Sequence, residues 1–225
     1  MRLAVVSDIH SNLHALKAVK TSIEAEGADM VVCSGDIVGY GAFPNECCRI
    51  VKDFARPAVL GNHDIAAITR VTDFMNPFAA QAAIWTANHL SSESRGYIQS
   101  LPGGAKFAVG RLKAAAFHGS PASVDEYVYE QDVGEDLFDQ LEETALILGH
   151  THVPFAKRVG DRMVVNPGAV GQPRDGDPRA SYAVLDTSHM SCAVRRVEYD
   201  IEGAAGAILS AGLPPILAHR LFEGT

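Results

Sequence analysis

Apolar residues in the first quarter of this chain alternate between short continuous runs and helix-spaced stripes. The run Leu3–Val6 is typical of a strand covered on both faces, and the apolar spacing over Leu13–Glu26 predicts an amphipathic helix. The same alternation then continues through a strand, a helix and a third strand. It predicts a layered α/β fold whose strands are buried between helices. The three later elements are expected at Asp29–Cys33, Asn45–Phe54 and Ala58–Leu60.

The pattern changes in the second half of the chain. The stretch Asn76–Leu101 is helical in character. From Lys106 onward, short apolar runs between turn residues predict a second set of strands, interrupted by a helix at Asp132–Glu142. The tail Glu202–Glu223 is expected to form one or two helices, broken at Pro214-Pro215. The late strands are expected at Phe107–Val109, Leu112–Phe117, Ala145–Leu148, Phe155–Val159, Met163–Val165, Ser181–Leu185 and Cys192–Val197.

This order of elements predicts two mixed β-sheets packed face to face, with helices on the outside, in a four-layer α-β-β-α sandwich. The length of 225 residues fits one domain that covers residues 1–225 and buries a substantial core. No internal repeat or low-complexity linker divides the chain. A helical segment at 73–101 is a candidate cap over a functional site.

Composition and charge narrow the possible functions. The residues are 47% hydrophobic and 20% charged, as in ordinary globular proteins, and the net charge is −8. Basic residues form no stripe, so we expect no stable binding of nucleic acid. No apolar run reaches the ~18–20 residues that span a bilayer, and no basic and apolar leader opens the chain. We therefore expect a cytoplasmic protein that does not associate with membranes.

Five polar clusters, each containing Asp, Asn or His, follow strand-like apolar runs. Loops gather at strand ends, so these side chains are expected to lie at one edge of the sheets. Carboxylate, amide and imidazole groups are ligands of divalent metal ions. The clusters are Asp8-Ile9-His10, Gly35-Asp36, Gly61-Asn62-His63-Asp64, His118-Gly119 and Gly149-His150-Thr151-His152.

The first cluster has the spacing of a chelating pair. Asp8 and His10 alternate beyond a strand, so their side chains point to the same side and can hold one ion. A helix cap is the structural alternative, and Ser11 or Asn12 could supply it. We expect Asn12 to cap the helix, which leaves Asp8 and His10 free for metal. Asn12 is also a candidate substrate contact.

The second and third clusters combine residue types that bind metals with residue types that are common in turns. Gly35 lets the backbone approach a site closely, and Asp36 can bridge two ions. The amide oxygen of Asn62 is a neutral hard ligand. In His63-Asp64, a carboxylate next to an imidazole can select the tautomer of the ring and raise its basicity.

Histidines complete the candidate set. A lone histidine such as His118 is more often structural than a metal ligand. His150 and His152, separated by one residue at a strand end, are more specific indicators of a metal site. His14 lies one helical turn after His10 and is a candidate to support the ligands indirectly.

The five clusters, in this order, resemble the calcineurin-like metallophosphoesterase superfamily, with the pattern D-x-H, G-D, G-N-H-[DE], H and G-H-x-H over Asp8–His152. The resemblance implies a two-sheet sandwich flanked by helices and a phosphoesterase with two metal ions. It also implies that His63 lies over the substrate phosphate as a catalytic residue, with Asp64 steadying it. The implied ligands are Asp8, His10 and His152 for the first metal, Asn62, His118 and His150 for the second, and Asp36 as the bridge.

The charges of this ligand set favour a phosphate substrate. Two divalent ions bring four positive charges, and Asp8 and Asp36 supply only two negative ones. We hypothesise in-line attack by a metal-bridging hydroxide on a phosphodiester or, alternatively, a phosphomonoester. His63 would stabilise the transition state or protonate the leaving oxygen. The nitrogen and oxygen ligands suit Mn, Fe, Zn, Co or Ni, and the resemblance favours Mn.

The residues after Asp36 narrow the subfamily. Protein phosphatases and symmetrical dinucleoside-tetraphosphate hydrolases carry G-D-x-[VI]-x-R-G, whereas Gly39-Tyr40 stands here in place of the residues that include the arginine. The chain therefore looks like the small prokaryotic phosphodiesterases of the superfamily. A dinucleoside polyphosphate hydrolase or a protein phosphatase-like phosphomonoesterase is the alternative. A metal-binding scaffold without activity is the non-enzyme alternative.

Two further residues are candidate substrate contacts. Arg174 lies in the Pro- and Gly-rich stretch Asn166–Asp175, which forms a rigid turn or places the guanidinium on a substrate phosphate. Tyr40 follows the bridging Asp36 by four residues and is expected to form a pocket wall. The expected partner is a small phosphate ester, and the oligomeric state is left open.

Overall fold

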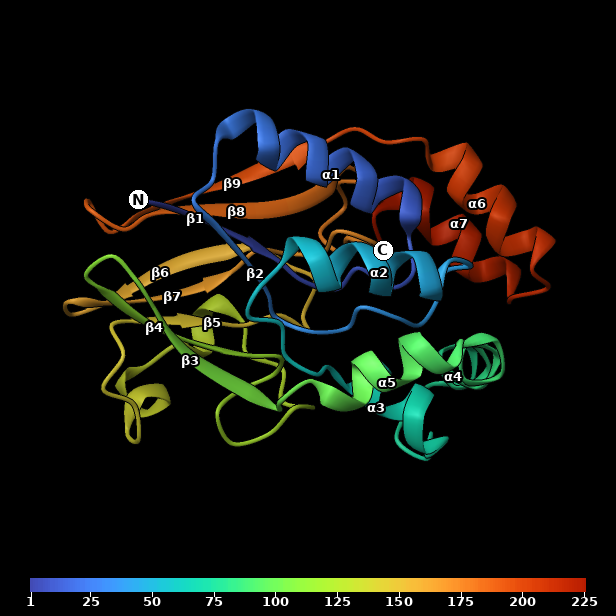
Figure 1. Ribbon diagram of the computed structural model, residues 1–225, viewed down its shortest axis with the longest axis horizontal. Helices are drawn as coiled ribbons and strands as arrows, with labels where there is room; N and C mark the ends of the chain where they lie inside the picture. Colours follow the sequence, from blue (N-terminus) through green and yellow to red (C-terminus); the bar gives the residue numbers. More distant parts are fainter.

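Two mixed β-sheets lie face to face at the centre of the protein, as a computed structural model of residues 1–225 shows (Figure 1). The four-stranded sheet has the order β2-β1-β8-β9, and the five-stranded sheet has the order β3-β4-β5-β7-β6. Both contain parallel and antiparallel pairs. The strands are β1 (Arg2–Val6), β2 (Met30–Cys33), β3 (Gly104–Val109), β4 (Leu112–Phe117), β5 (Ala145–Ile147), β6 (Phe155–Val159), β7 (Arg162–Asn166), β8 (Ala180–Asp186) and β9 (Ser191–Val197).

The inner faces of the two sheets form one apolar core. Leu3 and Val5 of β1 pack there with Ala114 of β4, Ile147 of β5 and Val165 of β7. Strand β1 supplies this core with alternate residues, while Ala4 and Val6 face the opposite side and join the core beneath the helices. Burial on both faces explains why β1 appears in the sequence as a continuous apolar run.

Helices flank the sheets, which confirms the predicted fold class. Helix α1 has the predicted bounds because both of its ends carry local signals. The side chain of Asn12 accepts a hydrogen bond from the backbone N–H of Ala15, and Gly27 ends the helix in the left-handed conformation. The helices are α1 (Leu13–Glu26), α2 (Pro44–Phe54), α3 (Asn62–Thr69), α4 (Pro77–His89), α5 (Ser92–Ser100), α6 (Ile201–Ser210) and α7 (Pro215–Glu223).

The candidate cap segment divides into two helices that pack in different places. Helix α5 contacts α2, and its Ile98 joins the core beneath α1 and α2. Helix α4 contributes Ala79 and Ala82 to a separate apolar cluster with α6, α7 and Tyr40. The break comes at Leu90, which is extended, after which the Ser91 side chain caps α5. A role as a cap remains a prediction.

Two predicted elements are wrong. The segment Ala58–Leu60 forms only an isolated bridge to Cys33, because Pro57 has no N–H and the N–H of Leu60 bonds to Pro102 instead of the sheet. The segment Asp132–Glu142 contains no α-helix.

That second segment consists of short 3-10 turns, Glu130–Asp132 and Glu135–Phe138. Gly134 is extended between them, and Gly and Asp are poor helix formers. The segment still covers the outer face of the five-stranded sheet, where Val133 and Phe138 pack on Leu146. None of the helices in the protein has both the length and the apolar character needed to cross a bilayer.

Candidate metal centre

The five polar clusters meet where the loops after β1, β2, β4 and β5 converge. Backbone hydrogen bonds join these loops directly: Asp8 donates to Gly35, His10 donates to Asp36, and Gly149 donates to His118. The side chains of the predicted metal ligands are buried, with Asn62 half-exposed. The fold therefore gathers all seven predicted ligands at one end of the two sheets.

The backbone at this site is strained. Five of the seven predicted ligands have positive φ values between 48° and 66°, a region that residues with a Cβ rarely adopt. Each such residue costs on the order of 1–3 kcal/mol, and such strain clusters at functional sites. These residues are Asp8, His10, Asp36, His150 and His152.

Two glycines allow imidazole rings to close on the loop that carries Asp36. Gly35 has a φ of 99°, and a Cβ there would lie 2.8 Å from Nδ1 of His118. Gly39 has a φ of 97°, and a Cβ there would lie 2.6 Å from Nδ1 of His63. Any larger residue at either position would displace a ring of the site. Gly39, noted in the sequence as part of the replacement for an arginine, thus has a packing role.

One group of ligand atoms comes from Asp8, His10 and His152. The Nε2 atoms of His10 and His152 lie 3.2 Å apart, and Nε2 of His152 lies 3.2 Å from Oδ1 of Asp8. The two Nδ1 atoms face backbone carbonyls, at 3.1 Å from Val38 and 2.5 Å from Gln172. A proton on each Nδ1 leaves a lone pair on each Nε2, and Oδ1 of Asp8 has no hydrogen-bond donor. Such a set of buried acceptors fits a cation.

A second group joins Asp36, Asn62, His118 and His150. Nε2 of His118 lies 3.1 Å from Oδ1 of Asn62 and 3.2 Å from Oδ2 of Asp36, while its Nδ1 faces the carbonyl of Ser34 at 2.8 Å. Nε2 of His150 is buried without a partner. The same Oδ2 of Asp36 lies 3.6 Å from Nε2 of His10, so Asp36 connects the two groups.

The electrostatics of the site also fit cations. Burial lowers the pKa of His150 to about 4, so this ring is neutral at neutral pH. Burial likewise lowers the pKa of His118, but the carboxylates of Asp36 and Asp8 outweigh it and raise the pKa to about 10. Burial raises the pKa of Asp36, yet His118 and His63 hold it well below its ordinary value. The two carboxylates therefore remain charged and favour positive charge between them.

Comparison with known proteins agrees with this geometry. The sequence model of the calcineurin-like phosphoesterase superfamily domain matches residues 1–190. The chain belongs to this superfamily. It is 36% identical over 240 residues to the uncharacterized protein MJ0912 of Methanocaldococcus jannaschii, which covers 99% of this chain and 98% of that protein. It is 27% identical over 201 residues to phosphodiesterase YfcE of Escherichia coli strain K12, which covers 85% of this chain and 90% of that protein.

A solved structure shares the whole fold. The crystal structure of a metallophosphoesterase from Sphaerobacter thermophilus has 38% sequence identity and a TM-score of 0.85, and the match covers 100% of this chain and 99% of that one. The α/β fold with two mixed sheets is thus that of calcineurin-like metallophosphoesterases. The family is metal-dependent, and the clustered Asp and His side chains of this chain are candidate ligands.

In this superfamily member, His63 lies among the ligand groups. Its ring centroid is 4.8 Å from that of His10 and 4.4 Å from that of Tyr40, and its Nδ1 is buried without a partner. A ring nitrogen of His63 also lies within 4.8 Å of ligand atoms of His10 and Asp36, so it is within reach of an ion as well as of a substrate.

The carboxylate of Asp64 forms no hydrogen bond with the ring of His63, contrary to the expected role. Its carboxylate accepts three backbone hydrogen bonds, from Ile37 at 3.2 Å, Val38 at 3.0 Å and Gly61 at 3.1 Å. Burial, together with Asp36, raises its pKa to about 7. Asp64 therefore positions the loop of Asp36 and the start of α3, and it supports His63 only through the backbone.

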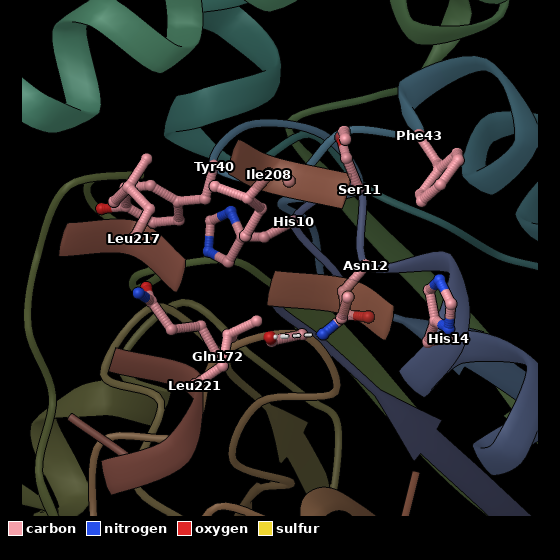
Figure 2. A pocket seen from close by; sticks show the side chains of 14 residues that line it. His10, Ser11, Asn12, His14, Tyr40, Phe43, Gln172, Ile208, Leu217 and Leu221 are labelled. Atoms are coloured by element: carbon pink, nitrogen blue, oxygen red, sulfur yellow. Dashed lines mark hydrogen bonds between the residues drawn. The ribbon is translucent and has the colours of Figure 1, made fainter. Parts of the chain in front are cut away.

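Two other predicted residues face away from the ligands. Asn12 uses both ends of its amide within the protein, accepting from Ala15 and donating to the carbonyl of Gly171 at 2.9 Å (Figure 2). His14 lies away from His10 in Figure 2, with its Nδ1 3.4 Å from Oδ2 of Asp200. The prediction that His14 supports His10 is wrong, because the side chain of His14 points toward α6.

Arg174, a predicted substrate contact, lies close to the metal centre. Two other residues near the metal centre, Tyr127 and Gln172, were not indicated by the sequence. Nη2 of Arg174 donates to the Tyr40 hydroxyl at 3.2 Å. The Tyr127 ring lies 4.1 Å from the His150 ring, centroid to centroid, and the Gln172 side chain is buried without a hydrogen bond. Tyr127 and Gln172 stand in loops without periodicity, so no local pattern marks them.

Proposed function

We propose that the chain is a dinuclear-metal-dependent phosphoesterase that hydrolyses phosphodiester bonds. The observation that carries this proposal is the position of Asp36, whose Oδ2 connects two groups of side chains of the residue types that bind metal ions. Residues Asp8, His10 and His152 would hold one ion, and Asn62, His118 and His150 the other. Mn is the proposed metal, as the sequence resemblance favours.

When bound, the two ions supply the Lewis-acid activation of the phosphoryl group and of the attacking water that in-line hydrolysis requires. The protein supplies the arrangement around them. The carbonyls of Val38, Ser34 and Gln172 hold Nδ1–H of His10, His118 and His152, which aims each Nε2 inward.

His63 is the proposed catalytic residue of the protein itself. Its ring is buried beside the ligands, and Gly39 leaves room for it there. It would hydrogen-bond the phosphoryl oxygen or give a proton to the leaving oxygen. A general acid or base of this kind typically increases the rate of the chemical step about 10²- to 10⁴-fold. The hydroxyl of Tyr40 accepts a hydrogen bond from Arg174. This bond would hold the guanidinium of Arg174 near His63, where it can contact a substrate phosphate.

The preference for diesters is supported by the similarity to a phosphodiesterase and by the absence of the protein-phosphatase arginine after Asp36. Dinucleoside polyphosphate hydrolysis and phosphomonoester hydrolysis are the alternatives for the same site. Location in the cytoplasm remains a prediction.

A metal-reconstituted screen tests the proposal. The protein, loaded separately with Mn, Fe, Zn, Co and Ni, is assayed on bis(p-nitrophenyl) phosphate, p-nitrophenyl phosphate, cyclic nucleotides and dinucleoside polyphosphates, ranked by kcat/KM. We expect diesters to rank first, with activity lost in Asp36→Asn and kept in Asp53→Asn, an exposed aspartate on α2. A protein that binds two metal ions per chain and hydrolyses none of these esters would support the scaffold alternative.

A further inference from the structure

Two tyrosines beside the candidate metal centre expose their rings to solvent. Tyr127 and Tyr129 stand in the loop that follows β4 and begins at the predicted ligand His118. Their ring centroids lie 6.2 Å apart and their planes are 13° from parallel, which is an offset stack. The exposed fraction is 51% for Tyr127 and 36% for Tyr129. The two rings therefore form one aromatic surface, which we call the tyrosine platform.

The residue between the two tyrosines explains why both rings face outward. Val128 is buried in the apolar cluster on the outer face of the five-stranded sheet, together with Leu146 and Leu148. Tyr129 has extended backbone angles, with a φ of −92° and a ψ of 168°. Because side chains alternate along extended backbone, the burial of Val128 places Tyr127 and Tyr129 on the same side, away from the sheet.

The platform stands next to the second group of predicted ligands. The ring centroid of Tyr127 lies 4.1 Å from that of His150, whose Nε2 is buried without a partner. The ring of His150 lies in turn beside that of His118, with 5.0 Å between the centroids. Tyr127 is therefore in direct contact with a predicted ligand of the second ion.

A structural role explains only part of this arrangement. Tyr127 covers His150, which is 5% exposed, and an apolar cover controls the access of solvent to a metal ligand. One side chain is sufficient for that purpose. Shielding does not explain why about half of Tyr127 stays exposed, or why a second aromatic ring is stacked beside it. Exposed aromatic faces beside a site are typical of surfaces that bind ligands.

The position of the platform relates it to one side of a substrate. A phosphodiester has two ester groups, of which one leaves and the other stays on phosphorus. His63, the proposed proton donor to the leaving oxygen, lies beside the first group of ligands, with its ring centroid 4.8 Å from that of His10. Tyr127 lies beside the second group. With the leaving oxygen at His63, the retained ester group is the one that can lie against Tyr127.

We propose that Tyr127, supported by Tyr129, stacks on an aromatic ring in the retained ester group of the substrate. The preferred substrates are then phosphodiesters whose retained group carries a nucleobase or an aryl ring, and Tyr127 is a specificity-determining residue. This inference rests on the proposed phosphodiesterase function. Nucleobases and aryl groups both have a π-face, and stacking on tyrosine selects for that face without requiring hydrogen bonds.

Two diesters with the same leaving group test the inference. Benzyl p-nitrophenyl phosphate and cyclohexylmethyl p-nitrophenyl phosphate have retained groups of similar size, and only the benzyl group is aromatic. For the metal-loaded wild type we expect kcat/KM to be about 2- to 10-fold higher for the benzyl ester, from stacking beyond apolar burial. Tyr127→Leu should bring this ratio close to unity, and Tyr127→Phe should retain it. Phe222→Leu is the control, because Phe222 on α7 is as exposed as Tyr127.

A binding measurement detects the stacking without catalysis. The base of 2-aminopurine riboside 5′-monophosphate is fluorescent, and stacking on an aromatic ring quenches its emission. Titration with the metal-loaded wild type should quench the fluorescence, and Tyr127→Phe should behave in the same way. In Tyr127→Leu we expect Kd to rise about 5- to 100-fold and the quenching to be lost, as on removal of one base-stacking side chain.

The two measurements separate the possible outcomes. If Tyr127→Leu lowers kcat/KM equally for both esters and leaves the quenching unchanged, the ring acts only through His150 or the loop, and the inference is wrong. A wild type that shows neither a preference for the benzyl ester nor quenching also overturns it. A Tyr127-dependent preference without quenching would support an aryl ring over a nucleobase. If neither ester is hydrolysed, the proposed function fails, and Tyr127-dependent quenching would still support the aromatic site.

Discussion

The Nε2 atoms of His10 and His152 lie 3.2 Å apart, although 141 residues of chain separate the two histidines. Each ring gives its Nδ1 side to a backbone carbonyl, so both lone pairs point at the same place. Without a cation this contact is repulsive, and the neighbouring unpaired oxygen of Asp8 adds to the repulsion. The arrangement is therefore stable only when positive charge lies between these atoms.

Removal of metal should destabilise the protein. A ligand that binds only the native state at 1,000 times its Kd contributes about 4 kcal/mol, and each kcal/mol shifts Tm by about 2–4 °C in a domain of this size. We expect chelation at pH 7.5 to lower Tm by roughly 10 °C and re-addition of Mn to restore it. Calorimetry of wild type and His152→Ala measures the effect. The variant should respond less to the chelator, and an equal response in both proteins would speak against this site.

Replacement of the shared carboxylate of Asp36 should lower the metal content of the centre. Asp36→Asn keeps the shape of the side chain but removes the charge that faces His10 and His118. We expect the metal content to fall below two ions per chain and kcat to fall more than about 100-fold. Elemental analysis and steady-state kinetics measure both, with Asp53→Asn as the control. Full metal content in Asp36→Asn would show that the two groups do not depend on this bridge.

The catalytic role of His63 predicts a dependence on the leaving group. His63→Ala should retain both ions. Its kcat should decrease about 10²- to 10⁴-fold on diesters with poor leaving groups, and much less on diesters with good leaving groups. A series of aryl diesters, plotted as log kcat against the leaving-group pKa, measures this as a steeper slope. His189→Ala, at an exposed surface position, is the control. A small loss on poor leaving groups with both metals bound would contradict the role.

Asp64 should act on stability through the backbone. In Asp64→Asn the single amide oxygen replaces two carboxylate oxygens that serve Ile37, Val38 and Gly61. At least one buried N–H then loses its acceptor, at a cost of about 1–3 kcal/mol. Urea denaturation should show this decrease in the free energy of unfolding. An unchanged unfolding midpoint, together with a His63-like loss of activity, would indicate a direct chemical role for the carboxylate instead.

Local signals account for the elements that were predicted well. Helix α1 agrees with its prediction because a capping asparagine, a periodic apolar stripe and a terminal glycine all lie within its own segment. The segment 132–142 was predicted wrongly, since its apolar residues bury against the sheet without helical structure. There the poor helix propensity of Gly and Asp and the contact with Leu146 together decide the conformation.

The sequence by itself determined which residues are candidates for the metal centre, because each predicted ligand belongs to a short cluster at the end of an apolar run. Tertiary structure alone decided how these residues face one another. The lone pairs of His10 and His152, the backbone partners of Asp64 and the hydrogen bond from Arg174 to Tyr40 all join distant segments. Periodicity within one segment reports which face of that segment is buried. It carries no information on which atom of another loop will lie opposite, since that depends on how the sheets and helices pack.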